Sequence, residues 1–193
     1  MRSRLLLPLL LICLAAACGD PNGTGITLTL FTDTLTLMVP SETGIAPSAV
    51  DLTNNAASPG GPCFGRLRTP ERAVGATCGW DFAVRRQSGD LVFVPAGAVG
   101  LMANAGVSQP DTRSFEEIRE APRANDAYVT DASVALRSDG VYLARSRTYR
   151  VRGTNCVNYA KLQVLDVDTL DAVQVELVTN GGCRNNRLVP EDS

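Results

Sequence analysis

The sequence contains no histidine, and Lys161 is its only lysine. Histidine is the side chain that most often transfers protons near neutral pH, and in its neutral form it is the commonest metal ligand. Its absence excludes Ser-His and Cys-His nucleophilic pairs. No serine in a recognisable motif stands near Lys161, so a Ser-Lys dyad is not indicated, and we expect this lysine on the surface of a strand. We therefore predict no catalytic residues and a protein that is not an enzyme.

The chain also lacks an excess of charge of one sign. Its 193 residues include 18 basic and 20 acidic side chains, and 45% of them are hydrophobic. This balance gives no overall electrostatic attraction to nucleic acid or to an anionic membrane. The sequence has no phosphate loop and no dinucleotide fingerprint. Its length and composition are those of one globular domain of moderate size.

The amino-terminal apolar run, residues 5–14, is too short to cross a bilayer, which takes about 20 residues. Arg2 and Arg4 precede this run, and three alanines at 15–17 follow it. A positive segment, an apolar segment and a small-residue cleavage site together form an export signal. We predict that residues 1–17 are a signal peptide.

The residue after this signal is Cys18, and residues 14–18, Leu-Ala-Ala-Ala-Cys, resemble a bacterial lipobox that has Ala15 where leucine is preferred. Losing Cys13 with the leader leaves an odd number of cysteines in an oxidising compartment. These are Cys18, Cys63, Cys78, Cys156 and Cys183. A lipid on Cys18 would let the other four form disulfides. The alternative is a soluble secreted protein with one unpaired thiol.

We therefore predict that residues 18–25 form a lipid anchor and a flexible tether. One acyl chain binds a membrane only weakly, and the three chains that the lipobox resemblance implies would hold the protein durably. Aspartate directly after the cysteine often retains such lipoproteins in the inner membrane. Gly19 stands at that position here, which favours the outer membrane.

The four remaining cysteines allow three pairings. We favour the local one, Cys63–Cys78 and Cys156–Cys183, in which each disulfide closes a short loop and adds about 3 kcal/mol in the chain-entropy model. The other interpretation is a four-cysteine zinc site. It lacks the C-x-x-C pair of such sites, so we predict no metal site.

Short runs of alternating apolar and polar residues predict strands over most of residues 26–193. The alternation changes parity between residues 26–30 and 35–39, which indicates a hairpin turn or a bulge at 32–34. Residues 80–84 and 91–94 read as two paired strands, and three further strands are expected at 141–147, 157–167 and 173–177.

Ser114 and Glu117 have the spacing of a capping box, which predicts a short helix over 114–120 that ends before Pro122. Together these patterns predict one mostly β domain over residues 26–193. We expect an antiparallel sandwich or flattened barrel with one short helix and two disulfides.

Two groups of charged residues are candidate sites. Arginines alternate around Tyr149, and guanidinium groups bind carboxylates and phosphates well. These residues could hold an anion or could simply form a solvated strand and turn; they are Arg145, Arg147, Arg150 and Arg152. Asp166, Asp168 and Asp171 lie close together, but the glycine and closing glutamate of a calcium loop are missing, so a polar turn is the simpler interpretation.

Several segments in order resemble the HmuY-type haem-carrier lipoproteins. The similar segments are GWDFAVRR (79–86), NAG (104–106), SFEEIREAP (114–122) and VYLARSR…VNYAKLQVLDVD (141–168). The resemblance covers about residues 76 to 178. It implies a lipid-anchored, all-β protein of the cell envelope that could carry haem. Uncharacterised envelope lipoproteins with a similar closing hairpin fit equally well.

The best-known members of that family hold haem iron between two histidines, which this chain does not have. Some relatives use methionine, so the resemblance points to Met38 or Met102. Met102 lies in a segment rich in glycine and alanine where a ligand could approach. A methionine that fills a gap in the core is the commoner case.

These observations favour a lipid-anchored, non-enzymatic binding or carrier module of the cell envelope. Its ligand would be a hydrophobic small molecule such as haem, and the candidate binding residues are Met102, Arg145, Arg147 and Tyr149. The alternative is a structural or accessory lipoprotein that contacts another envelope protein. An enzyme would need an acid pair drawn from Asp81, Asp166, Asp168 and Glu176.

Overall fold

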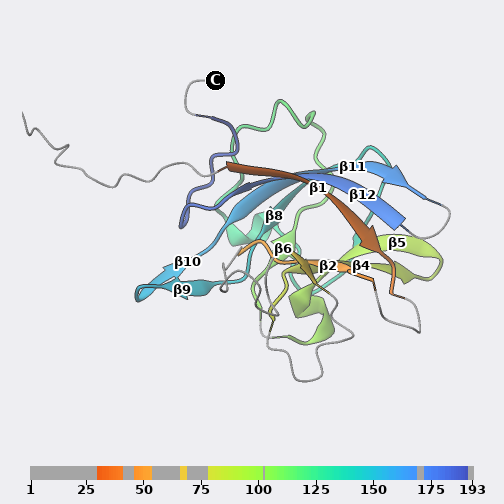
Figure 1. Cartoon of the computed structure of the whole chain (residues 1–193), viewed down its shortest axis with the longest axis horizontal. Helices are drawn as coiled ribbons and strands as arrows, with labels where there is room; N and C mark the ends of the chain where they lie inside the picture. Colours follow the sequence, from red (N-terminus) through yellow and green to blue (C-terminus); the bar gives the residue numbers. More distant parts are fainter. Residues whose placement is uncertain are drawn as a thin grey trace, which may run out of the picture.

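In the part of the chain that the structure describes, the strands form two antiparallel sheets and a small projecting hairpin (Figure 1). The computed structural model describes residues 30–40, 46–53, 66–68, 78–101, 103–168 and 172–190. The expected signal peptide, Cys18 and the tether lie outside the described residues, as do Cys63 and Met102.

Each sheet has five strands. The first has the order β1 (Leu30–Met38), β12 (Ala172–Asn180), β11 (Tyr159–Val167), β8 (Val141–Arg145) and β6 (Gly106–Val107). The second has the order β3 (Leu67–Arg68), β2 (Ala49–Val50), β4 (Phe82–Gln87), β5 (Asp90–Pro95) and β7 (Val134–Ala135). The projecting hairpin is β9 (Tyr149–Val151) paired with β10 (Thr154–Cys156), and the described residues also contain the 3₁₀ turns η2 (Ala96–Val99) and η3 (Asn125–Ala127).

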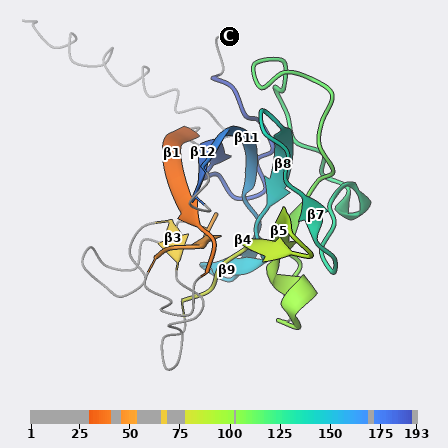
Figure 2. The same cartoon turned by 90° about the vertical axis from the view of Figure 1, so that its right-hand side faces the viewer.

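The two sheets pack face to face over one apolar core (Figure 2). Phe93 on β5 lies at the centre of this core, with ring centroids 5.6 Å from Phe82 on β4 and 5.1 Å from Tyr142 on β8. Among the described residues no strand pairing joins the sheets, so they form a sandwich rather than a flattened barrel. The prediction of a mostly β, antiparallel fold is confirmed.

The first sheet is buried on its outer face as well. The residues of β8 and β11 that alternate with the core residues, such as Leu143 and Tyr159, point to this outer face. They pack in a second apolar cluster beneath the segment that contains Phe115, Ile118 and Tyr128. Strands buried on both faces have no exposed polar row, which explains why all five residues of β8 are buried. The candidate site described below lies at the end of this outer face.

The turn or bulge expected at residues 32–34 does not exist. β1 pairs with β12 in unbroken register from Leu30 opposite Asn180 to Met38 opposite Ala172. Leu30 packs against the outer cluster, whereas Leu35 belongs to the core between the sheets. The parity change in the sequence therefore reflects two buried faces along one continuous strand.

The helix expected at 114–120 does not form, although the capping box does. The Ser114 amide donates to a Glu117 carboxylate oxygen at 2.7 Å, and the Glu117 amide donates to the Ser114 hydroxyl at 3.3 Å. In a helix the Ile118 carbonyl would accept from residue 122, but Pro122 has no N–H group. Lys161 donates to that carbonyl instead, so the segment stops after a single turn.

One of the two expected disulfides is seen. Cys156 and Cys183 are joined, with their Cα atoms 4.8 Å apart. Cys63 lies outside the described residues, so the Cys63–Cys78 pair stays a prediction, and Cys78 itself is not without a partner. In the part of the chain that the structure describes, no helix is both long and apolar enough to cross a membrane.

Candidate functional site

A pocket of about 340 Å³ opens on the outer side of the first sheet, beside the β9–β10 hairpin. Among the described residues, three arginines, two uncharged polar residues, one valine and one tyrosine line it, and none of these is acidic. The lining residues are Arg123, Arg145, Thr148, Asn155, Val157, Tyr159 and Arg184. This set is called the arginine pocket below.

Arg145 is the most buried of the three arginines. It is the last residue of β8 and stands directly opposite Tyr159 on β11 and Gly106 on β6. Its guanidinium donates from Nη1 to the Asn125 side-chain oxygen. The residue is only 8% exposed, and its Nε has no hydrogen-bond partner. A buried donor without a partner costs about 1–3 kcal/mol, and more when the group is charged.

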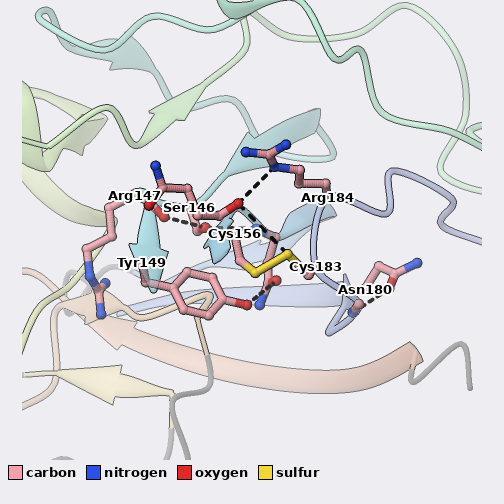
Figure 3. Close-up of a disulfide and its surroundings, with 10 residues drawn as sticks. Ser146, Arg147, Tyr149, Cys156, Asn180, Cys183 and Arg184 are labelled. Carbon is pink, nitrogen blue, oxygen red and sulfur yellow. Dashed lines mark hydrogen bonds between the residues drawn. A yellow bond between two sulfur atoms is a disulfide. The ribbon is translucent and has the colours of Figure 1, made fainter. Parts of the chain in front are cut away.

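The other two arginines reach the pocket from loops. Arg123 donates from Nε and Nη2 to the Asn186 side-chain oxygen at 3.1 and 3.0 Å. Arg184 follows the disulfide and donates from Nε to the Asn155 backbone oxygen at 2.8 Å (Figure 3). All three guanidinium groups are thus oriented by amide oxygens, which carry no net charge.

The pocket arginines differ in this respect from Arg68 and Arg113. Arg68 lies 2.7 Å from Asp51, and Arg113 lies 2.7 Å from Asp111. Within the described residues, none of the three pocket arginines forms an ion pair with a carboxylate. The pocket therefore holds three positive charges without a counter-charge, together with N–H groups that can bind the oxygens of a carboxylate or phosphate.

A second polar cluster is buried around Arg147, which follows β8. The Asp81 side chain is fully buried and accepts from the Leu52 amide at 2.6 Å and from the Arg147 amide at 2.7 Å. Asp51 accepts from the Thr53 hydroxyl at 2.7 Å. The Arg147 guanidinium lies 3.1 Å from both carboxylates.

The charges in this buried cluster balance, because Asp51 and Asp81 face Arg68 and Arg147. Burial raises the pKa of Asp81 to about 6, against the opposing effect of the Arg147 charge. Burial also acts to raise the pKa of Asp51, but the Arg147 charge and hydrogen bonds from Thr53 outweigh it, so the pKa lies below its ordinary value. We interpret this cluster as a structural link between the sheets.

The structure divides the predicted binding residues between these two places. Arg145 lines the arginine pocket, whereas Arg147 lies in the buried cluster and points away from Arg184 (Figure 3). The Tyr149 hydroxyl donates to the Asn158 side chain at 2.7 Å, and its pKa is raised by burial. Met102 lies outside the described residues, so its role stays a prediction.

Arg150 and Arg152 are exposed on the β9–β10 hairpin, so the four arginines do not form one continuous stripe. Lys161, expected on the surface, is instead 5% exposed, and its ammonium donates to the Phe115 carbonyl at 2.7 Å and the Ile118 carbonyl at 3.1 Å. Burial lowers its pKa.

Sequence reasoning missed Arg123 and Arg184 as pocket residues. They lie 22 residues before and 39 residues after Arg145 in the chain, and neither belongs to a motif. The one available signal was that Arg184 directly follows Cys183 of a predicted disulfide.

Comparison of the chain with protein families, with curated proteins and with solved structures gives no match.

Proposed function

We propose that this protein is an exported, lipid-anchored binding module of the cell envelope, without catalytic activity, and that its ligand is a small anion held in the arginine pocket. The lipobox-like leader and the odd number of cysteines that remain after its removal support export and a lipid anchor at the cell envelope. The arginine pocket supports the binding role, since its lining offers positive charge and donors for carboxylate or phosphate oxygens.

The observation that carries the proposal is the state of Arg145. Its charge is buried, it has no carboxylate partner among the described residues, and its Nε lacks a hydrogen bond. Buried charges in proteins are normally paired, because removing a charge from water without compensation costs several kcal/mol. An anion in the pocket would supply the missing charge.

The lining favours an anion over an apolar ligand. Of the described lining residues, Val157 and Tyr159 are the largely hydrophobic ones, whereas pockets for hydrophobic small molecules are lined mainly by apolar and aromatic side chains. Haem carriage through Met102 stays a second proposal, and haem would bring its two carboxylates to any arginine site.

Isothermal titration tests the proposal on the mature protein, extracted from membranes in detergent. The probes are citrate, inorganic phosphate and haemin. We expect citrate or phosphate to bind, and Arg145→Gln to weaken binding about tenfold or more, since a hydrogen bond to a charged group contributes about 1.5–3 kcal/mol.

Arg150→Gln is the matched control, because it removes an arginine that is exposed on the nearby hairpin and leaves the pocket intact. It should leave the affinity within about twofold, as surface substitutions usually have small effects. Equal losses in both variants would mean that only net charge matters. If no probe binds, the proposal of a binding module is wrong, and an accessory lipoprotein that contacts another envelope protein becomes the better interpretation.

A further inference from the structure

We infer that the Cys156–Cys183 disulfide assembles the arginine pocket, so that anion binding is coupled to the oxidised state of this disulfide. The inference rests on the proposed function and adds a means of regulating the same site.

The disulfide lies within the wall of the pocket. Asn155 and Val157, which line the pocket, flank Cys156, and Arg184, which also lines it, directly follows Cys183. The bond joins β10 to the segment after β12, across 27 residues of sequence. Figure 3 shows Arg184 beside the disulfide, with its guanidinium hydrogen-bonded to the backbone carbonyl of Asn155 on β10.

Arg184 is held in a conformation that its residue type disfavours. Its φ is +58°, in the left-handed region that L residues with a side chain rarely adopt. Its amide donates to the Val157 carbonyl at 3.0 Å, and its Nε donates to the Asn155 carbonyl at 2.8 Å. Both hydrogen bonds are accepted by neighbours of Cys156. The disulfide therefore holds the segment that carries Arg184 against the segment that carries both acceptors. Because Arg184 is exposed, water competes for its Nε bond once the covalent link is cut.

The effect extends to a second arginine. The segment that begins at Cys183 continues to Asn186, whose side-chain oxygen orients Arg123 and whose side-chain nitrogen donates to the Ala121 carbonyl at 2.7 Å. Arg145, in contrast, is oriented by Asn125 on η3, away from this segment. Reduction should therefore misplace Arg184 and leave Arg145 in position. Arg123 should be affected less than Arg184, because the Ala121 amide also donates to the Asn186 carbonyl at 2.8 Å.

The redox step needs a dithiol as reductant. Cys183 is partly exposed and Cys156 is 1% exposed, so the dithiol reaches the Cys183 sulfur first. The S–S bond breaks and takes up two electrons and two protons to give two thiols, while the dithiol is oxidised to its own disulfide.

The first test compares citrate affinity by isothermal titration for the mature wild-type protein and for the double variant Cys156→Ser/Cys183→Ser. We expect the variant to bind citrate about tenfold or more weakly, with the near-ultraviolet circular dichroism of the wild type retained as the control for an intact fold. Equal affinity in the two proteins would overturn the inference and leave the proposed function standing.

A second measurement uses the wild type alone, so it does not depend on the variant folding. If oxidation favours citrate binding, citrate must by linkage favour the oxidised disulfide by the same factor. The protein is equilibrated with graded ratios of reduced to oxidised dithiothreitol, and thiols are trapped by alkylation and located by peptide mass. Saturating citrate should lower the reduced-to-oxidised ratio of Cys156 and Cys183 by the factor seen in the affinities. If citrate binds and leaves that ratio unchanged, the inference is wrong. If the oxidised wild type binds neither citrate nor phosphate, the proposed function fails and the inference fails with it.

Discussion

Arg147 donates two hydrogen bonds to one oxygen of Asp81, from its backbone amide at 2.7 Å and from its guanidinium at 3.1 Å. Asp81 directly precedes β4 of the second sheet, and Arg147 follows β8 of the first. The pair therefore joins the two layers at one end of the sandwich by polar contacts, whereas the core between the sheets is apolar. A fully buried carboxylate in this position makes stability depend on pH.

We expect Asp81 to make the fold less stable as pH rises from about 4 to about 6. Its folded-state pKa of about 6 lies above the ordinary value of 3.8, so in this window the folded state keeps a proton that the unfolded state has lost. The free energy of unfolding of the wild type, relative to Asp81→Asn, should fall by up to about 3 kcal/mol across the window. Urea unfolding at pH 2 to 8 measures this difference.

Asp51→Asn supplies the control of opposite sign. The pKa of Asp51 is lowered, so the stability that this carboxylate contributes is present above pH 3.8 and is lost as pH falls further. The wild type should therefore lose stability as pH falls below 3.8, and Asp51→Asn should not show this loss. Parallel pH curves for the wild type and Asp81→Asn would contradict the prediction.

Gly79→Ala should disrupt the same cluster by contact alone. A Cβ at residue 79 would lie 2.7 Å from Nε and Cζ of Arg147, so the guanidinium would have to move from its place between Asp51 and Asp81. We expect a loss of about 1–3 kcal/mol by urea unfolding, as for other disrupted buried networks. In an Arg147→Ala background the same change should cost much less, and equal costs in both backgrounds would exclude contact with Arg147 as the cause.

The strands were predictable because their signals are local. The β4–β5 hairpin was predicted from two apolar runs on either side of Ser88-Gly89-Asp90. In the structure the turn is Ser88-Gly89, and both residues have positive φ, as a tight two-residue hairpin requires. The Cys156–Cys183 disulfide was predictable from the parity and spacing of the cysteines. Each of these features needs only neighbouring residues or a simple count.

The features that the sequence did not reveal depend on contacts between distant segments. Lys161 appeared exposed because a lone lysine on a strand usually is, and only the fold brings the carbonyls of Phe115 and Ile118 over it. Arg145 and Arg147 are two residues apart, but the chain leaves β8 between them, so one enters the arginine pocket and the other the buried cluster. Spacing alone could not separate their roles.

Lys161→Met should destabilise the protein by about 1–3 kcal/mol, because two carbonyls covered by the outer cluster lose their donor. The change keeps an unbranched side chain that is one atom shorter, and it removes the contact of the Lys161 ammonium with the Phe115 ring. Urea unfolding measures the loss, and faster amide exchange at residues 114–118 would place it at the turn. Gln163→Met, on the same face of β11, is the matched control, and equal losses in the two variants would refute a specific role for the ammonium.

Citrate binding to the arginine pocket should weaken as salt rises. The screening length falls from about 10 Å at 0.1 M to about 3 Å at 1 M, so the attraction of three uncompensated arginines for a trivalent anion is reduced. We expect the affinity to fall about tenfold or more over this range by isothermal titration in sodium chloride. Arg145→Gln, with one charge fewer, should show a smaller dependence on salt, and a salt-independent affinity would place citrate outside the pocket.

Intact mass tests both the anchor and the cysteines that lie outside the described residues. Protein extracted from membranes of its native host should be heavier than residues 18–193 by a glyceride and acyl chains, because a lipobox cysteine is modified before it becomes the first residue. Reduction should add about 4 Da if Cys63–Cys78 forms in addition to the observed Cys156–Cys183 disulfide, and about 2 Da if it does not. Cys18→Ser should abolish the lipid mass and release the protein from the membrane fraction without changing the gain on reduction. An unmodified wild-type mass with a free thiol would show that Cys18 is not an anchor, and the arginine pocket would then have to act in a secreted protein.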